Sequence, residues 1–369
     1  MSEMTSAERL AAALEGKPTD HIPFSPNLAY VWETTFPQEV QWRGQLDFLQ
    51  DIGADPLWRG APCPVQPVMP DEVEIRTFRS NKRMRKEVET PVGTIVSEHV
   101  ASSAGNTFFL TGHPLKTEDD FKTQLWLEEH TRYEYNPTAV YTHLQGAGRF
   151  GLSIGMLIPE TMKSAFQGLI EHYAGTEETI YALVDYPETV EALLYQQMEN
   201  HYKIAEMAVQ APYDYFLTWE DSGTQNYSPK MYRQYIAPEI TRWNEILEAS
   251  GKHYIQHACG HVKELVAIMR EQGNWGIESV APPPTGNISI AEVREIGGPE
   301  FTIIGGMEPV ILLQRPIEEL AAYTKQVIEE GRGGPFILGN SDSCPPGVTM
   351  AKFRLAAEIA RNSPGLKGR

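Results

Sequence analysis

Six short runs of apolar residues recur along the second half of the chain, separated by segments with the 3.6-residue period of amphipathic helices. Runs this short and this apolar are typical of strands buried on both faces of a parallel sheet. One helical segment begins with Ser228 as N-cap and Pro229 in the first turn. The predicted strands cover residues 150–156, 213–219, 252–257, 275–280, 301–306 and 335–339, and the predicted helices cover 187–208, 229–249, 262–272, 288–296 and 317–330.

Two weaker strands precede these six, at residues 21–27 and 55–58. Together they give eight alternating strand and helix units, which is the number in a closed (β/α)8 barrel. A doubly wound sheet is the alternative, but no glycine-rich phosphate loop follows the first strand. We therefore predict an α/β fold of the TIM-barrel type.

The pattern changes between residues 72 and 100, where charged and apolar residues alternate around turn signals at 80–82 and 90–93. This alternation predicts antiparallel hairpins inserted between elements of the barrel. An N-terminal helix precedes the first strand, and a polar helix over 117–130 follows the hairpins. No Gly/Ser linker or charge block divides the sequence, so residues 1–369 are expected to form a single barrel domain.

The charge balance limits the classes of partner. The 369 residues include 49 acidic and 31 basic side chains, with a formal net charge of −18. This excess argues against nucleic acid or an anionic membrane as the main partner. No apolar run approaches the roughly 20 residues of a membrane-spanning helix, and the start of the chain is a charged amphipathic segment rather than a signal peptide. We expect a cytoplasmic protein whose three scattered cysteines are free thiols.

Polar side chains follow several of the predicted strands. In a barrel of parallel strands, catalytic residues lie at the carboxyl ends of the strands. Glu220 and Asp221 are candidates for orienting the substrate or a ligand histidine, and capping of the next turn is the alternative. The full set of candidates at strand ends is Glu220, Asp221, His257, Cys259, Glu278 and Cys344.

His257 and Cys259 lie two residues apart, and such residues point to the same side of an extended segment. Their nitrogen and sulfur atoms can meet at one ion, and Cys344, three units further round the barrel, can reach the same point. One imidazole and two thiolates favour zinc, with one position open for chemistry that Glu278 can fill at rest. The alternative is that the cysteines are small core residues, which explains Cys344 poorly because it lies in a proline-rich loop.

Aromatic residues lie near several predicted strand ends. Tyr30, Trp32 and Trp219 are candidates for the walls of a flat, apolar substrate pocket. Packing in the core is the alternative for all three.

At these positions the chain resembles the uroporphyrinogen decarboxylase superfamily, and within it the zinc-dependent, corrinoid-linked methyltransferase branch. The resemblance implies a (β/α)8 barrel in which His257, Cys259 and Cys344 bind zinc. The decarboxylase branch fits badly, because residues 26–35 contain no arginine for a polycarboxylated tetrapyrrole. The segments that carry the resemblance are residues 5–16, 20–24, 89–94, 228–232, 257–260 and 304–306, together with Cys344.

The resemblance implies transfer of a methyl group from a small methylated substrate to the Co(I) corrinoid of a carrier protein. The aromatic candidates favour an aryl methyl ether as the methyl donor. The chain has no D-x-H-x-x-G corrinoid-binding segment, so the corrinoid is expected on a separate partner. Methyl transfer from a methylcobamide to a thiol of the coenzyme M type is an alternative, as are porphyrinogen decarboxylation and a non-catalytic zinc-binding barrel. The sequence is also compatible with a homo-oligomer.

Overall fold

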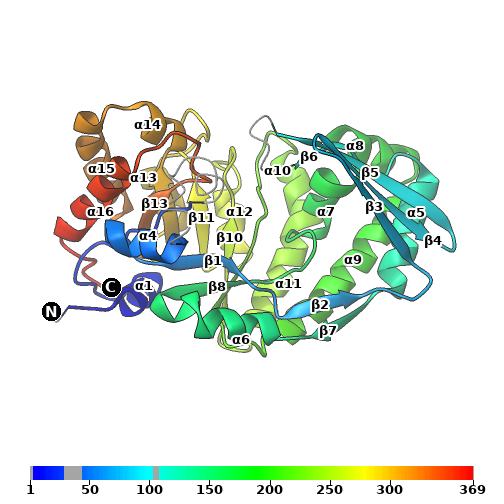
Figure 1. Ribbon diagram of the computed structural model, residues 1–369, viewed down its shortest axis with the longest axis horizontal. Coiled ribbons are helices and arrows are strands. Elements are labelled where there is room, and N and C mark those ends of the chain that lie inside the picture. Colours follow the sequence, from blue (N-terminus) through cyan, green and yellow to red (C-terminus); the bar gives the residue numbers. More distant parts are fainter. Residues whose placement is uncertain (1–2, 29–43, 103–107, 369) are drawn as a thin grey trace.

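The computed structural model describes residues 3–28, 44–102 and 108–368 of the chain. Its centre is a curled sheet of seven strands, each parallel to its neighbours (Figure 1). Three neighbouring strands, β11, β12 and β13, are buried along their whole length, as the continuous apolar runs predict. In order across the sheet the strands are β1 (Leu57–Ala61), β8 (Leu152–Met156), β9 (Tyr215–Thr218), β10 (His253–His257), β11 (Gly276–Val280), β12 (Thr302–Met307) and β13 (Phe336–Asn340).

A short segment before β1 closes this sheet into a barrel. Phe24 forms a parallel bridge with Leu338 of β13, and the Ser25 N–H donates to the Leu338 carbonyl at 2.8 Å. On the other side, the Asp55 N–H donates to the Phe24 carbonyl at 2.7 Å, just before β1 begins. Prolines at positions 23 and 26 have no N–H, so this seam cannot extend into a regular ladder.

The predicted barrel is therefore confirmed. All six runs of the second half form strands of the parallel sheet, and residues 55–58 overlap β1. Residues 21–27 contribute the eighth position through a single bridge rather than through a named strand. The early strands gave weak sequence signals because prolines interrupt them.

The helices begin where side chains can satisfy free backbone N–H groups. Thr117 and Asp120 form a reciprocal capping box at the start of α5, and Ser228 caps α10 as predicted. None of the helices among the described residues is both long and apolar enough to cross a bilayer. The α-helices are α1 (Ser6–Leu14), α4 (Gln45–Ile52), α5 (Glu118–His130), α6 (Thr138–Gln145), α7 (Ala165–Gly168), α8 (Thr176–Asp185), α9 (Pro187–Ala208), α10 (Pro229–Met231), α11 (Ala237–Glu248), α12 (Val266–Glu271), α13 (Ile290–Gly297), α14 (Pro309–Gln314), α15 (Ile317–Gly331) and α16 (Met350–Asn362).

Among the described residues there are also three short helical turns of other types. A 3-10 turn, η1 (Ala147–Phe150), precedes β8, and a π turn, η2 (Leu169–Tyr173), continues α7. A second π turn, η3 (Tyr232–Ile236), joins α10 to α11, so the predicted helix over 229–249 forms with a bulge in its first half. Such π turns are frequent at functional sites.

The predicted hairpins form a separate antiparallel sheet. It contains β3 (Glu74–Arg79), β4 (Arg83–Thr90), β5 (Gly93–Ala101) and β6 (Phe108–Gly112), of which β6 lies beyond the predicted range. Helix α5 packs against β5, and this sheet lies at the end of the molecule opposite α15 and α16 (Figure 1). A second pair, β2 (Val65–Val68) with β7 (Arg132–Tyr135), joins it to the barrel.

Candidate metal centre and substrate cavity

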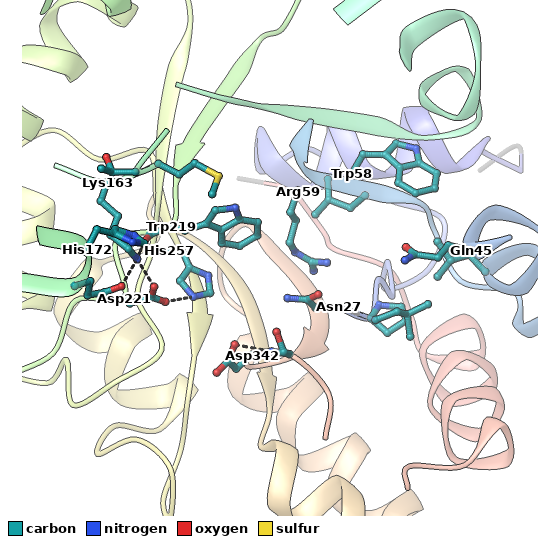
Figure 2. Close-up of a pocket in the computed structure, with 18 residues that line it drawn as sticks. Asn27, Gln45, Trp58, Arg59, Lys163, His172, Trp219, Asp221, His257 and Asp342 are labelled. Atoms are coloured by element: carbon teal, nitrogen blue, oxygen red, sulfur yellow. Dashed lines mark hydrogen bonds and ion pairs between the residues drawn. The ribbon is translucent and has the colours of Figure 1, made fainter. Parts of the chain in front are cut away.

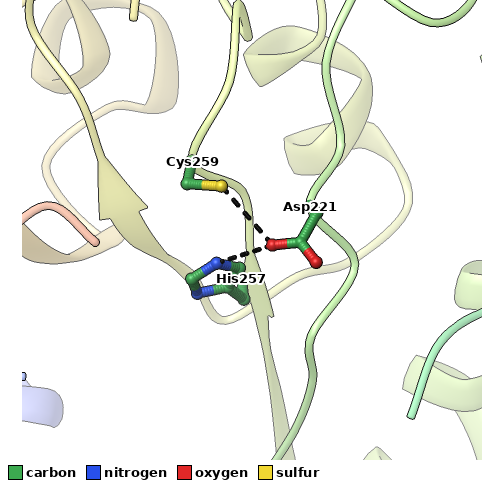
Figure 3. A group of neighbouring side chains, drawn as sticks. All are labelled: Asp221, His257 and Cys259. Carbon is green, nitrogen blue, oxygen red and sulfur yellow. Dashed lines mark hydrogen bonds and ion pairs between the residues drawn. The ribbon is translucent and has the colours of Figure 1, made fainter. Parts of the chain in front are cut away.

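Three potential ligand atoms meet at the carboxyl ends of two neighbouring barrel strands. Asp221 follows β9, and His257 and Cys259 stand at the end of β10. Their ligand atoms all lie within 4.8 Å of one another (Figure 3). Asp221 Oδ1 lies 3.0 Å from His257 Nε2 and 3.4 Å from Cys259 Sγ, so the carboxylate accepts from both predicted zinc ligands. Asp221 has φ of +46°, a conformation that an aspartate tolerates and that turns its side chain into this group.

A buried chain of charges holds the other side of the histidine ring. Glu278 Oε2 accepts from His257 Nδ1, and Glu278 Oε1 lies 2.9 Å from Arg59 Nε. Burial opposes protonation of the imidazole, but the carboxylates of Glu278 and Asp221 outweigh it and raise the pKa of His257. Glu278 therefore fixes the ring so that Nε2 faces Asp221, rather than standing beside Cys259 as a further ligand.

These groups face a cavity of about 670 Å³ at the mouth of the barrel (Figure 2). Asp221 and His257 line it together with Trp58 and Trp219, whose rings supply apolar surface. The Trp219 ring stands edge-on to the imidazole, with ring centroids 4.8 Å apart. Gly60 makes this position available, because a Cβ there would lie 3.0 Å from the indole. The cavity thus combines apolar walls with a polar end.

Positive charge reaches the cavity from the segment after β8. Lys163 forms ion pairs with Asp221 and, at 2.7 Å, with Glu171. Burial alone would lower the pKa of Lys163, but these two carboxylates outweigh it and raise that pKa. The π turn η2 carries Glu171 and His172 into the cavity wall. Burial, reinforced by Lys163, lowers the pKa of His172 to about 4, so this imidazole is neutral near pH 7.

Glu220, predicted beside Asp221 as a catalytic residue, points away from this cavity. Its carboxyl is fully buried and accepts from the Ser164 N–H at 2.5 Å, from Ser164 Oγ at 2.8 Å and from Thr218 Oγ1 at 3.0 Å. Burial raises the pKa of Glu220 to about 7. The described geometry gives Glu220 a role in holding the start of α7.

Cys344 does not belong to the group formed by Asp221, His257 and Cys259. It is buried in the loop after β13, where burial raises the pKa of its thiol and the positive charge of Lys352 offsets only part of that rise. Its neighbours Asp342 and Ser343 do line the cavity. The loop therefore reaches the mouth, while the thiol itself packs outside the group.

Of the three aromatic residues predicted to line the substrate pocket, one lies in the described part of the chain, and the cavity also contains residues that were not predicted. Tyr30 and Trp32 lie outside the described residues, whereas Trp219 lines the cavity as predicted. Sequence reasoning missed Arg59, because the predicted strand over 55–58 stops one residue before it. It also missed the segment around Lys163, since residues on a loop and an irregular helical turn follow no apolar period.

Comparisons with known proteins place this arrangement in a family. Among solved structures, a methyltransferase from Methanosarcina mazei is 15% identical over 98% of this chain and 99% of its own, with a TM-score of 0.60, and it has the same fold. A B12-independent methionine synthase from Shewanella sp. W3-18-1, in complex with selenomethionine, is 11% identical over 93% and 97% of the two chains, with a TM-score of 0.44. No curated protein matches the sequence. The model of the uroporphyrinogen decarboxylase (URO-D) family matches residues 168–363, more than half of the chain. The chain therefore belongs to the uroporphyrinogen decarboxylase family.

Proposed function

We propose that this protein is a zinc-dependent methyltransferase that transfers a methyl group from an aryl methyl ether to the Co(I) corrinoid of a separate carrier protein. The observation that carries the proposal is the group formed by His257, Cys259 and Asp221 beside a large cavity at the barrel mouth, which His257 and Asp221 line. Enzymes with this fold carry their chemistry at that face. A decarboxylase of a many-fold anion is disfavoured, because the cavity also presents the carboxylates of Asp221, Glu171 and Asp342.

The donor atoms fit zinc. An imidazole nitrogen and a thiolate sulfur are ligands that zinc prefers over magnesium or calcium. We propose His257, Cys259 and Cys344 as the protein ligands. In the metal-free chain Asp221 Oδ1 then accepts hydrogen bonds from His257 Nε2 and Cys259 Sγ, which would release their protons to solvent on binding metal. Because Cys344 Sγ lies outside the group, the loop after β13 has to rearrange for this thiol to bind.

Zinc at this position would supply a Lewis acid for the oxygen that loses the methyl group. The chain's own residues bind and orient the substrate. Trp58 and Trp219 offer flat apolar surfaces to an aryl ring. The Lys163 ammonium, fixed by Asp221 and Glu171, places positive charge near the polar end of the cavity. Such preorganised charge favours an oxygen that becomes more negative as the methyl group leaves.

The decisive experiment is a methyl-transfer assay with the zinc-loaded protein. It uses a purified carrier protein with its corrinoid reduced to Co(I), and a panel of methoxyarenes, methylamines and thiols. We expect a methoxyarene to convert Co(I) into methylcobalt with release of the corresponding phenol. The change in visible absorption of the corrinoid measures this reaction. The Cys259→Ala variant should lose both zinc and this reaction. The control Cys63→Ala should retain both, because it removes a thiol that only donates a hydrogen bond to the Leu157 carbonyl.

Two results would contradict the proposal. One is demethylation of methylcobalt by a thiol without any reaction of the ethers, which assigns a thiol methyltransferase. The other is release of carbon dioxide from a porphyrinogen. A full equivalent of zinc in Cys259→Ala would separately contradict the assignment of the metal ligands.

A further inference from the structure

The antiparallel sheet β3–β6 leaves one face uncovered. Register places Arg83, Val100 and Phe109 in one row across β4, β5 and β6, so their side chains share a face. Phe78 pairs with Arg85, two residues from Arg83, and lies on the same face. Ile95 belongs to the opposite face and is buried where α5 packs against β5.

Large apolar side chains on this open face contact solvent. Phe78 is 54% exposed, Val100 39% and Phe109 61%. A hollow of about 470 Å³ lies beside them, lined in part by Phe78, Arg83 and Val100. Arginine side chains of β4 stand between Phe78 and Val100, so exposed apolar and cationic residues share this face. Exposed large apolar side chains rimmed by polar groups are typical of sites that bind another macromolecule.

The turn between β3 and β4 concentrates positive charge in an otherwise acidic chain, whereas Arg76 and Arg85 on the two strands are paired with glutamates of the same hairpin. Residues 76–86 contain six basic side chains and no acidic one, although the net charge of the whole chain is −18. Lys82, in the turn between β3 and β4, and Arg83 are exposed, and the structure shows no ion pair for either within its described residues. We call Phe78, Lys82, Arg83, Val100 and Phe109 the sheet patch.

The sheet patch belongs to the same part of the fold as the cavity wall. Strand β6 leads into His113, whose ring lies against Gly175, two residues after η2; a Cβ at Gly175 would lie 3.2 Å from this imidazole. The Leu115 N–H donates to the Tyr173 carbonyl of η2 at 2.9 Å, which ties the end of this segment to the wall. The segment from Phe109 to Leu115 therefore connects the sheet patch to the wall of the cavity.

We infer that the sheet patch is the docking surface for an acidic face of the corrinoid carrier protein. This inference rests on the proposed function, which requires a second protein to bring cobalt to the cavity. The patch combines exposed apolar anchors with unpaired cations, so a partner with carboxylates around an apolar centre complements it. Opposite charges across such an interface speed encounter and fix orientation.

The test measures binding of corrinoid carrier proteins, purified from the source organism with cobalamin bound, to the full chain by titration calorimetry. The charge-reversal variant Lys82→Glu/Arg83→Glu should bind the carrier about tenfold more weakly than the unmodified protein. Higher salt should weaken binding of the unmodified protein and have less effect on the variant. Phe109→Ser, which keeps the charges, should also weaken binding. Lys325→Glu/Arg354→Glu makes the same charge change on exposed positions of α15 and α16 and should leave affinity unchanged.

A parallel reaction separates docking from chemistry. Free cob(I)alamin needs no docking surface, so all the variants should methylate it at the rate of the unmodified protein. If the unmodified protein methylates neither free nor carried cobalt, the proposed function fails, while the binding measurement still judges the patch. Equal carrier affinity in the unmodified protein and the Lys82→Glu/Arg83→Glu variant overturns the docking surface. The docking surface is also overturned if the unmodified protein forms a dimer that this variant dissociates, or if it binds an oligonucleotide and this variant abolishes that binding.

Discussion

The buried carboxyl of Glu220 predicts that the stability of the fold depends on pH. The substitution Glu220→Gln removes the ionisable group and preserves its size. The amide oxygen can still accept from the Ser164 N–H and Thr218 Oγ1, and the amide nitrogen can donate to Ser164 Oγ, now 2.8 Å from the carboxyl. The variant therefore isolates the effect of charge at this position.

The magnitude follows from the pKa of Glu220, which burial raises from an ordinary 4.5 to about 7. Below pH 4.5 the carboxyl is protonated in the folded and the unfolded chain, so its pKa shift does not disfavour folding there. Between pH 4.5 and about 7 the unfolded chain releases this proton while the folded chain keeps it, so stability falls as pH rises. Above pH 7 the loss is complete and amounts to about 3 kcal/mol.

The assay is urea denaturation of the unmodified protein and Glu220→Gln from about pH 5 to about pH 8. The difference between their free energies of unfolding should grow with pH in favour of the glutamine variant. Glu358→Gln, at an exposed position of α16, controls for the loss of one negative charge. A difference that stays constant across this range would refute the reasoning. Loss of methyl transfer in a folded Glu220→Gln protein would restore the catalytic role that the sequence predicted.

Three further predictions concern the centre and the cavity. Glu278→Gln should weaken zinc binding about tenfold or more, since it alters the carboxylate that orients the histidine, and competition with a chromophoric chelator measures this; unchanged affinity would remove Glu278 from that role. In metal analysis, Cys344→Ala should lose its equivalent of zinc, whereas Asp221→Asn should retain it. The reverse result would make Asp221 the third ligand. Gly60→Ala should destabilise the chain by more than about 1 kcal/mol in thermal unfolding, because φ is +71° there, and it should shift the fluorescence of Trp219; an unchanged spectrum would contradict the contact.

The sequence predicts the barrel well because each buried strand needs a continuous apolar run. Residues 301–306 and 335–339, for example, form β12 and β13 with small changes at their ends. The seam at Phe24 is harder to predict, since one bridge between two prolines leaves almost no pattern. Strand β6 lay beyond the predicted hairpins, although Gly105-Asn106 before it is a turn signal that could have predicted a further strand.

In the candidate site too, residues next to strands were easier to predict than residues in loops. The closeness of His257 and Cys259 could be predicted because residues two apart in an extended segment point the same way, although β10 itself ends at His257. Asp221 was found at the correct strand end, but sequence alone could not separate it from Glu220, whose burial depends on contacts with Ser164. The position of Cys344 depends on how a loop of several residues turns, which no local period determines.

The seam between Phe24 and Leu338 has a consequence for the cavity above it. This side of the barrel has few cross-strand backbone bonds, and segments with few such bonds open at low free energy. The loop that carries Asp342 and Cys344 leaves β13 at that side, and Asn27 continues from the other partner of the seam into the cavity lining. Local opening of the barrel is therefore expected beside the cavity, next to the loop that would have to move for Cys344 to reach the proposed metal, rather than at β10, which pairs with a strand on each side.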